Sequence, residues 1–140
     1  MGLDNGIHLK TKNKIDLNDW EIVPDYIKIE FDEFSTKEYN DGYYYDICYW
    51  RKCWNIRHII LNIVDKENDG GIYEIDKPSQ IQNIINAIII LLENMEEWEQ
   101  SIWTAEEMIP HLAQDIVNLS WLKKYKLEHP EAKIIFYDSY

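Results

Sequence analysis

The fold expected for this chain depends on one stretch of its sequence, YYYDICYWRKCWNIRH, which runs from Tyr43 to His58. It holds six aromatic side chains, both cysteines and both arginines of the protein. At about 100° per residue, its apolar side chains and those that follow gather on one side of a helix. The stretch therefore predicts a helix over residues 43–65. The inward face of this helix is expected to carry Trp50, Trp54 and Arg57.

Strands are favoured at both ends of the chain. Residues 6–12 alternate weakly between apolar and polar side chains, and residues 26–34 alternate strictly. A turn signal, Asn40-Asp41-Gly42, separates the second of these strands from the helix. Residues 71–75 and 132–137 are short runs of β-forming side chains. We predict strands at all four places, with a loop over residues 11–19.

Two more helices are predicted from repeating apolar side chains. The first begins at Pro78, where a missing N–H costs nothing, and keeps its helical spacing as far as Trp98. The second begins with a capping box formed by Thr104 and Glu107, and continues to the lysines that precede residue 130. Pro110 must kink this helix or mark its true start.

Residues 1–140 are expected to form one α+β domain. The length suits a single domain. Because the strands cluster at the two ends of the chain, the N-terminal and C-terminal strands should be neighbours in a short, mainly antiparallel sheet. About three helices would then pack on one face of that sheet.

The charge of the protein limits its partners. It has 26 acidic side chains against 14 lysines and arginines, which gives a formal net charge of -12 and a pI near 4.6. Nucleic-acid binding needs a basic stripe, so no nucleic-acid partner is expected. The apolar run over residues 81–92 is too short to cross a bilayer and no secretory leader is apparent, so no membrane partner is expected. Two reduced cysteines fit a cytoplasmic protein.

Arg57 is the least expected residue on the predicted inward face. A guanidinium keeps its charge, so burial requires acceptor groups beside it. One interpretation is an internal partner: Asp4, Asp46 or the C-terminal carboxylate of Tyr140. The other is a phosphate or carboxylate of a ligand, held bidentately between tryptophan faces.

The aromatic and cationic side chains of the stretch suggest a ligand site. Tyrosine rings can stack on a base, while arginine and lysine can neutralise phosphates. The competing interpretation is that several of the rings pack under neighbouring strands. The candidate ligand-binding residues are Tyr44, Tyr49, Trp50, Arg51, Lys52, Trp54, Arg57 and His58.

No catalytic or metal-binding signature is complete in the sequence. The four histidines, His8, His58, His111 and His129, have no second ligand at metal-binding spacing, so no metal site is expected. Cys53 would need a base and positive surroundings to act as a nucleophile, and it falls on the predicted buried face. We therefore expect no catalytic residues and no cofactor.

Two motifs resemble a family of small proteins carried by bacteriophages and prophages. They are Met1-Gly2-Leu3-Asp4 and the central Tyr49-Trp50-Arg51-Lys52, which Asn55-Ile56-Arg57-His58 follows. The aromatic end of the chain, residues 135–140, is also similar to that family. The resemblance implies a phage-encoded accessory protein without implying a reaction. Because Asp4 and both arginines belong to these motifs, Asp4 is expected to form a structural ion pair with one of the arginines.

Two functional hypotheses follow. In the first, the protein is a non-enzymatic sponge that binds a small anionic, nucleotide-like ligand and so counters an immune signal of the host. In the second, its acidic surface mimics nucleic acid or caps a basic host protein. Both place the protein in the host cytoplasm. The aromatic surface exceeds what one small core can hide, which favours a homodimer.

Overall fold

The computed structural model describes residues 4–13, 15, 36–39, 42–64, 71–98 and 103–139 of the chain. Five strands in this part form one antiparallel sheet with the order β2-β3-β1-β5-β4. The strands are β1 (Asp4–Thr11), β2 (Thr36–Tyr39), β3 (Gly42–Arg51), β4 (Ile72–Glu74) and β5 (Lys133–Ser139). The helices are α2 (Trp54–Ile63), α3 (Pro78–Glu93) and α4 (Ala105–Glu128), with a short 3-10 turn at Met95–Glu97.

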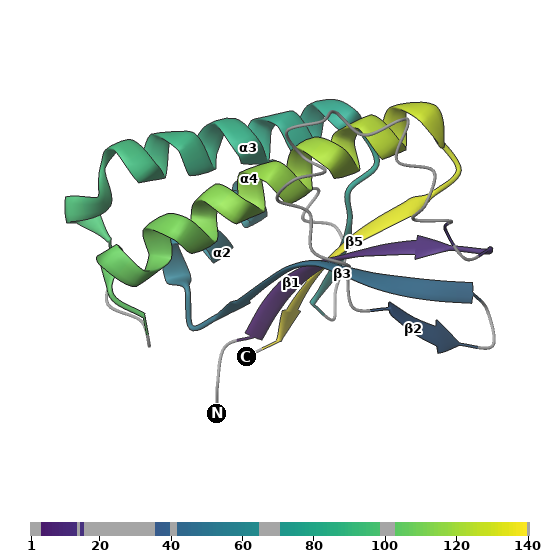
Figure 1. Ribbon diagram of the computed structural model, residues 1–140, viewed down its shortest axis with the longest axis horizontal. Coiled ribbons are helices and arrows are strands. Elements are labelled where there is room, and N and C mark those ends of the chain that lie inside the picture. Colours follow the sequence, from purple (N-terminus) through teal and green to yellow (C-terminus); the bar gives the residue numbers. More distant parts are fainter. Residues whose placement is uncertain are drawn as a thin grey trace.

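The architecture is α+β, as the sequence predicted. Figure 1 shows α3 and α4 side by side over one face of the sheet. The N-terminal and C-terminal strands are direct neighbours, because β1 pairs with β5 along its length. The core lies between the sheet and the helices. Its fully buried side chains include Ile7, Leu9, Tyr45, Trp50, Ile134 and Phe136 from the sheet, and Ile81, Ile84, Ile88, Met108, Leu112 and Leu119 from the helices.

The predicted starts of α3 and α4 are confirmed. Pro78 is the first residue of α3. Thr104 caps α4: its hydroxyl accepts from the Glu107 N–H at 3.2 Å, and the Glu107 carboxylate accepts from the Thr104 N–H at 3.3 Å. Pro110 lies inside α4 and does not mark its start. These boundaries follow from local chemistry, since each cap satisfies backbone N–H groups that the helix itself leaves unpaired.

The prediction of one helix over residues 43–65 is wrong. Residues 42–51 form strand β3, and only Trp54–Ile63 is helical. Tyrosine, isoleucine and tryptophan are strong strand formers. Strands β1 and β2 form backbone hydrogen bonds with this segment from either side. Tyr45 and Trp50 are buried, while Asp46, Tyr49 and Arg51 are exposed. A helical period fits the same apolar positions, and for that reason periodicity alone chose the wrong element.

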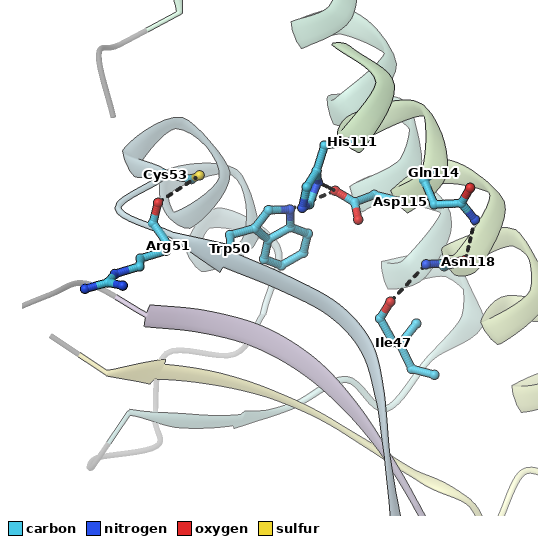
Figure 2. Close-up of polar contacts among 8 residues, drawn as sticks. All are labelled: Ile47, Trp50, Arg51, Cys53, His111, Gln114, Asp115 and Asn118. Atoms are coloured by element: carbon cyan, nitrogen blue, oxygen red, sulfur yellow. Dashed lines mark hydrogen bonds and ion pairs between the residues drawn. The ribbon is translucent and has the colours of Figure 1, made fainter. Parts of the chain in front are cut away.

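A β-bulge interrupts β3. Ile7 pairs with Cys48 and His8 pairs with Asp46, so Ile47 is an extra residue on this strand. A bulge resets the alternation of a strand, and both Ile47 and Cys48 are accordingly buried. The side chain of Asn118 on α4 donates to the Ile47 carbonyl at 3.1 Å, and Gln114 in turn donates to Asn118 at 3.0 Å (Figure 2). Helix α4 therefore holds the bulge in place.

The remaining strand predictions divide into two groups. The strands expected at residues 6–12, 71–75 and 132–137 are present as β1, β4 and β5 within a few residues. The strand expected at residues 26–34 lies outside the described residues, as does most of the expected loop over 11–19. Strand β2 was not predicted; it pairs with β3 and forms one edge of the sheet.

Replacing Asn118 with alanine should destabilise the fold through the bulge. The change removes the side-chain donor to the buried Ile47 carbonyl, so the free energy of unfolding should fall by about 1–3 kcal/mol. Urea denaturation followed by tryptophan fluorescence measures this. Ser120→Ala is the control, because the Ser120 hydroxyl bonds only within its own helix, to the Ile116 carbonyl. A loss of the same size in both variants would show that the bulge does not depend on Asn118.

Candidate functional site on the open face of the sheet

The sheet turns a second face away from α3 and α4. Alternation places Asp4, His8 and Lys10 of β1 on this open face, beside Tyr44, Asp46, Tyr49 and Arg51 of β3 and Tyr137 of β5. Several of these side chains meet solvent: Arg51 is 53% exposed, Asp46 46% and Asp4 43%. The open-face cluster is defined here as Asp4, His8, Tyr44, Asp46, Tyr49, Arg51 and Tyr137.

The bulge in β3 assembles this cluster. Asp46 and Tyr49 are three residues apart, so a regular strand would place them on opposite faces. With the extra residue Ile47 between them, Asp46 stands opposite His8 and Tyr49 stands opposite Gly6, and both lie on the open face. Figure 2 shows the alternation of side chains at the end of the strand, where Arg51 points away from α4 and Trp50 points towards it.

One half of the cluster is centred on His8. Its imidazole Nε2 contacts Oδ1 of the Asp46 carboxylate. The Tyr137 ring lies against the His8 ring with centroids 4.6 Å apart, and the Tyr44 ring approaches it edge-on at 6.5 Å. Lys10 Nζ lies 5.2 Å from the centre of the Tyr44 ring, a cation–π distance. A cation thus already rests on one of the aromatic faces of this surface.

The other half is centred on Asp4. The Tyr49 hydroxyl donates to Asp4 Oδ1 at 2.9 Å, and Arg51 Nε lies 3.9 Å from the same oxygen. The hydrogen bond to Asp4 raises the pKa of Tyr49, because it favours the protonated phenol. The expected ion pair of Asp4 with an arginine is therefore present with Arg51, but at an exposed position where it contributes little stability.

Gly6 makes room for Tyr137 between the two halves. A Cβ atom on Gly6 would lie 2.5 Å from Cε1 of Tyr137 and 2.7 Å from the Cys48 carbonyl oxygen. The tyrosine ring can cross the strand only because Gly6 has no side chain. Burial raises the pKa of Tyr137 to about 12, with further effect from Asp46, Tyr49 and Asp4. A phenol with this pKa stays neutral near pH 7 and acts as a hydrogen-bond donor.

The structure does not bring all the candidate ligand residues together. Tyr44, Tyr49 and Arg51 lie on the open face, as described. Trp50 is fully buried on the opposite face, under α4. Lys52 lies in the turn between β3 and α2 with a positive φ of 54°, and Trp54 and His58 are exposed on α2. Trp50, Trp54 and Arg57 therefore do not share one inward helix face.

Arg57 has an internal partner, Asp138, that was not among the three proposed; of those three, Tyr140 lies outside the described residues. The Arg57 Nε donates to both carboxylate oxygens of Asp138 on β5, each at 3.0 Å. The Asp138 side chain is 2% exposed and that of Arg57 16%. Asn5 on β1 also donates to Asp138, and the Trp54 ring centre lies 6.0 Å from the Arg57 guanidinium carbon. Arg57 is thus engaged by a buried carboxylate that ties α2 to the sheet.

A second buried carboxylate, Asp115 of α4, ties that helix to β3. Its Oδ2 accepts from the Trp50 indole N–H at 2.8 Å and lies 3.0 Å from His111 Nδ1 (Figure 2). Burial, together with the neighbouring Asp115, raises the pKa of the Cys48 thiol well above its usual value. Cys53 is also fully buried. Both thiols are buried, whereas a nucleophilic cysteine is partly exposed.

Within the described ranges, no group of three or more histidine, cysteine, aspartate or glutamate side chains could hold a metal ion. Within the same ranges, no helix is long and apolar enough to cross a membrane. Comparisons of the chain with protein-family models, with curated proteins and with solved structures found no match.

Sequence reasoning missed His8, Asp46 and Tyr137 as members of the site. They come from three strands that are far apart in the chain, and only strand pairing makes them neighbours. One signal in the sequence was available for Asp46: it sits between Tyr45 and Ile47, which is the alternation of a half-buried strand.

Loss of Asp138 should cost far more stability than loss of Asp4. Asp138→Ala leaves the Arg57 guanidinium without its buried carboxylate, so the free energy of unfolding should fall by about 3 kcal/mol. Asp4→Ala is the matched control, because exposed ion pairs contribute only about 0–1 kcal/mol. Chemical denaturation of both variants measures the difference. Similar losses in the two variants would contradict the assignment of Asp138 as the structural partner.

His111 should make a pH-dependent contribution to stability. Its hydrogen bond to Asp115 raises the pKa of His111 above the usual 6.5. Stabilisation by the charged imidazole is therefore fully present below pH 6.5 and disappears as the pH rises through the raised folded-state pKa. The difference in unfolding free energy between the wild type and His111→Gln should shrink as the pH rises above 6.5. Urea denaturation at a series of pH values tests it, and a difference that grows with pH would refute it.

Proposed function

We propose that this protein is a non-enzymatic binding protein that docks a basic partner protein on its open-face cluster. The observation that carries the proposal is the position of two carboxylates, those of Asp4 and Asp46, nearly half exposed among tyrosine rings on a sheet face. Tyrosine and arginine are enriched in protein interfaces, where their large, partly polar side chains contribute much of the binding energy.

The chemistry of the cluster suits a lysine or arginine side chain of the partner. An ammonium or guanidinium group can lie on a tyrosine face and pair with an adjacent carboxylate at the same time. Tyr49 is 45% exposed and stands beside Asp4, so this pair offers both contacts. The net charge of -12 would also speed the approach of a basic protein.

A small anionic ligand is the second candidate function. It is favoured by one observation: the exposed Arg51 guanidinium and the exposed Tyr49 side chain lie near the same oxygen of Asp4. Two features weigh against it. Arg57, the residue expected to grip a phosphate, is engaged by Asp138. The carboxylates of Asp4 and Asp46 would also compete with a phosphate for the cations of the open face, since Asp4 already pairs with Arg51.

The resemblance to phage and prophage proteins suggests which kind of basic protein the partner is. On this hypothesis the basic partner is a host protein met in the host cytoplasm, and occupation of its basic surface is the inhibitory act. If the second candidate function is correct, the same resemblance would make the protein a sponge that binds a nucleotide-like signal of the host.

The test is binding of a fluorescent arginine-rich peptide, measured by anisotropy at physiological salt and again at high salt. The double variant Tyr49→Ala/Asp46→Asn should bind at least about tenfold more weakly, a change of about 1.4 kcal/mol. The control, Leu127→Ala/Glu128→Gln, removes one exposed apolar side chain and one negative charge from the end of α4. It should change the affinity by less than about twofold. Thermal unfolding confirms that each variant is folded.

Two outcomes would overturn the proposal. If both double variants weaken peptide binding equally, the attraction is due to total charge and the cluster is not a docking site. If a set of nucleotides binds more tightly than the peptide, and Arg51→Ala abolishes that binding, the second candidate function replaces the first.

A further inference from the structure

We infer that the outer face of helix α3 is a self-association surface that pairs with the same helix of a second copy of this chain. The inference does not depend on the open-face cluster, which lies on the other side of the sheet. It starts from the charge distribution of α3. Between Lys77 and Glu93 the helix has no charged side chain over residues 78–92, although 29% of the residues in the chain are charged.

The outer surface of α3 carries no charge of its own, although Lys123 of α4 borders it and its Nζ donates to Gln82 Oε1 at 2.9 Å. This surface of the helix is exposed. Its inward side chains, such as Ile84 and Ile88, are fully buried in the core. At about 100° per residue, one line of side chains points away from the core. This line consists of Ser79, Asn83, Asn86 and Ile90, all exposed, with Ile89 beside it. Ile90 is 61% exposed and Ile89 39%. Solvent-facing helix surfaces normally carry charged side chains, and this one carries asparagine and isoleucine.

Charge selects a second copy as the occupant. A basic partner would be drawn to the acidic parts of the surface, and an uncharged helix face offers it nothing specific. Two copies that each carry -12 repel one another wherever their carboxylates meet. The repulsion is smallest where both surfaces are uncharged. An uncharged face is therefore the surface through which an acidic protein can contact another acidic protein with least repulsion. The simplest such partner is a second copy of this chain.

The sequence of the face suits two-fold symmetry. An interface between identical copies is usually isologous, so each residue near the axis meets itself. With the axis at Asn86 and the helices antiparallel, Asn83 faces Ile89 of the second copy and Gln82 faces Ile90. The Asn86 amide carries both donors and an acceptor, so it can pair with its own copy across the axis. Its Oδ1 already accepts from Gln82 Nε2 at 2.8 Å, which fixes its orientation.

The first test is the mass in solution. Light scattering at tens of micromolar should give twice the chain mass of 16.9 kDa. The dimer should strengthen as salt is raised, because salt screens the repulsion between the acidic copies. A mass of one chain at every salt concentration would overturn the inference.

The second test uses complementary charges at the axis. Asn86 is exposed on the helix, and glutamate and lysine are both good helix formers. The variants Asn86→Glu and Asn86→Lys should therefore fold. Each alone should be monomeric, since like charges would face each other across the axis. An equimolar mixture of the two should recover the dimer, because opposite charges then face each other. Failure of the mixture to dimerise would place the contact elsewhere and refute the α3 pairing.

Ile72→Glu is the matched control. Ile72 lies on β4 and is 56% exposed, about as much as Ile90, but it belongs to the sheet. This variant should keep the dimer, while Ile90→Glu should lose it. The reverse result would show that two copies meet through the sheet, and the inference for α3 would be wrong.

Discussion

Contact between strand β3 and helix α4 sets the geometry of both faces of the sheet. Asn118 holds the extra carbonyl of the bulge, and Asp115 holds the indole of Trp50. Buried polar groups must find partners, so these two contacts fix where β3 lies along α4 and which of its side chains point inward. If β3 slipped by one residue, Trp50 would turn to solvent and Arg51 would turn into the core. The cost of burying that guanidinium without a partner helps to specify one register.

The open-face cluster is a consequence of the same bulge. Because the alternation of β3 changes phase at Ile47, the strand can bury Tyr45 and Trp50 while presenting Asp46 and Tyr49 outward. The central position of β1 then brings His8 and Asp4 beside them, and β5 adds Tyr137 over Gly6. Three strands therefore place aromatic rings and carboxylates on one surface, while the hydrogen bonds that fix the bulge lie on the other side. Residues such as Asn118 can affect the site without belonging to it.

Charge gives the molecule two surfaces of different character. Carboxylates alternate with cations and tyrosine rings on the open face of the sheet, and this mixture is the surface on which we propose that a basic partner docks. The outer face of α3 has no charged side chain between residues 78 and 92. Dimerisation through α3 would leave the open-face clusters of both copies facing outward. Two linked clusters would bind a repeated or symmetric partner more tightly than one, since the second contact forms at a high effective concentration.

The sequence alone determined the elements whose signals are local. Pro78 and the capping box of Thr104 and Glu107 located the starts of α3 and α4, and the strand patterns at the two ends of the chain predicted β1 and β5. The acidic charge and the incomplete catalytic motifs likewise needed no structure. Local signals led to the wrong prediction for residues 43–51, because their aromatic side chains suit both a helical and a strand period. Pairing with β1 and β2 made them a strand, and the bulge placed Asp46 and Tyr49 on one face. The partner of Arg57 was also beyond the sequence: Asp138 lies 81 residues away along the chain, and many carboxylates could have served. Tertiary structure decided these points because strand register and buried ion pairs depend on which distant segments the core brings together.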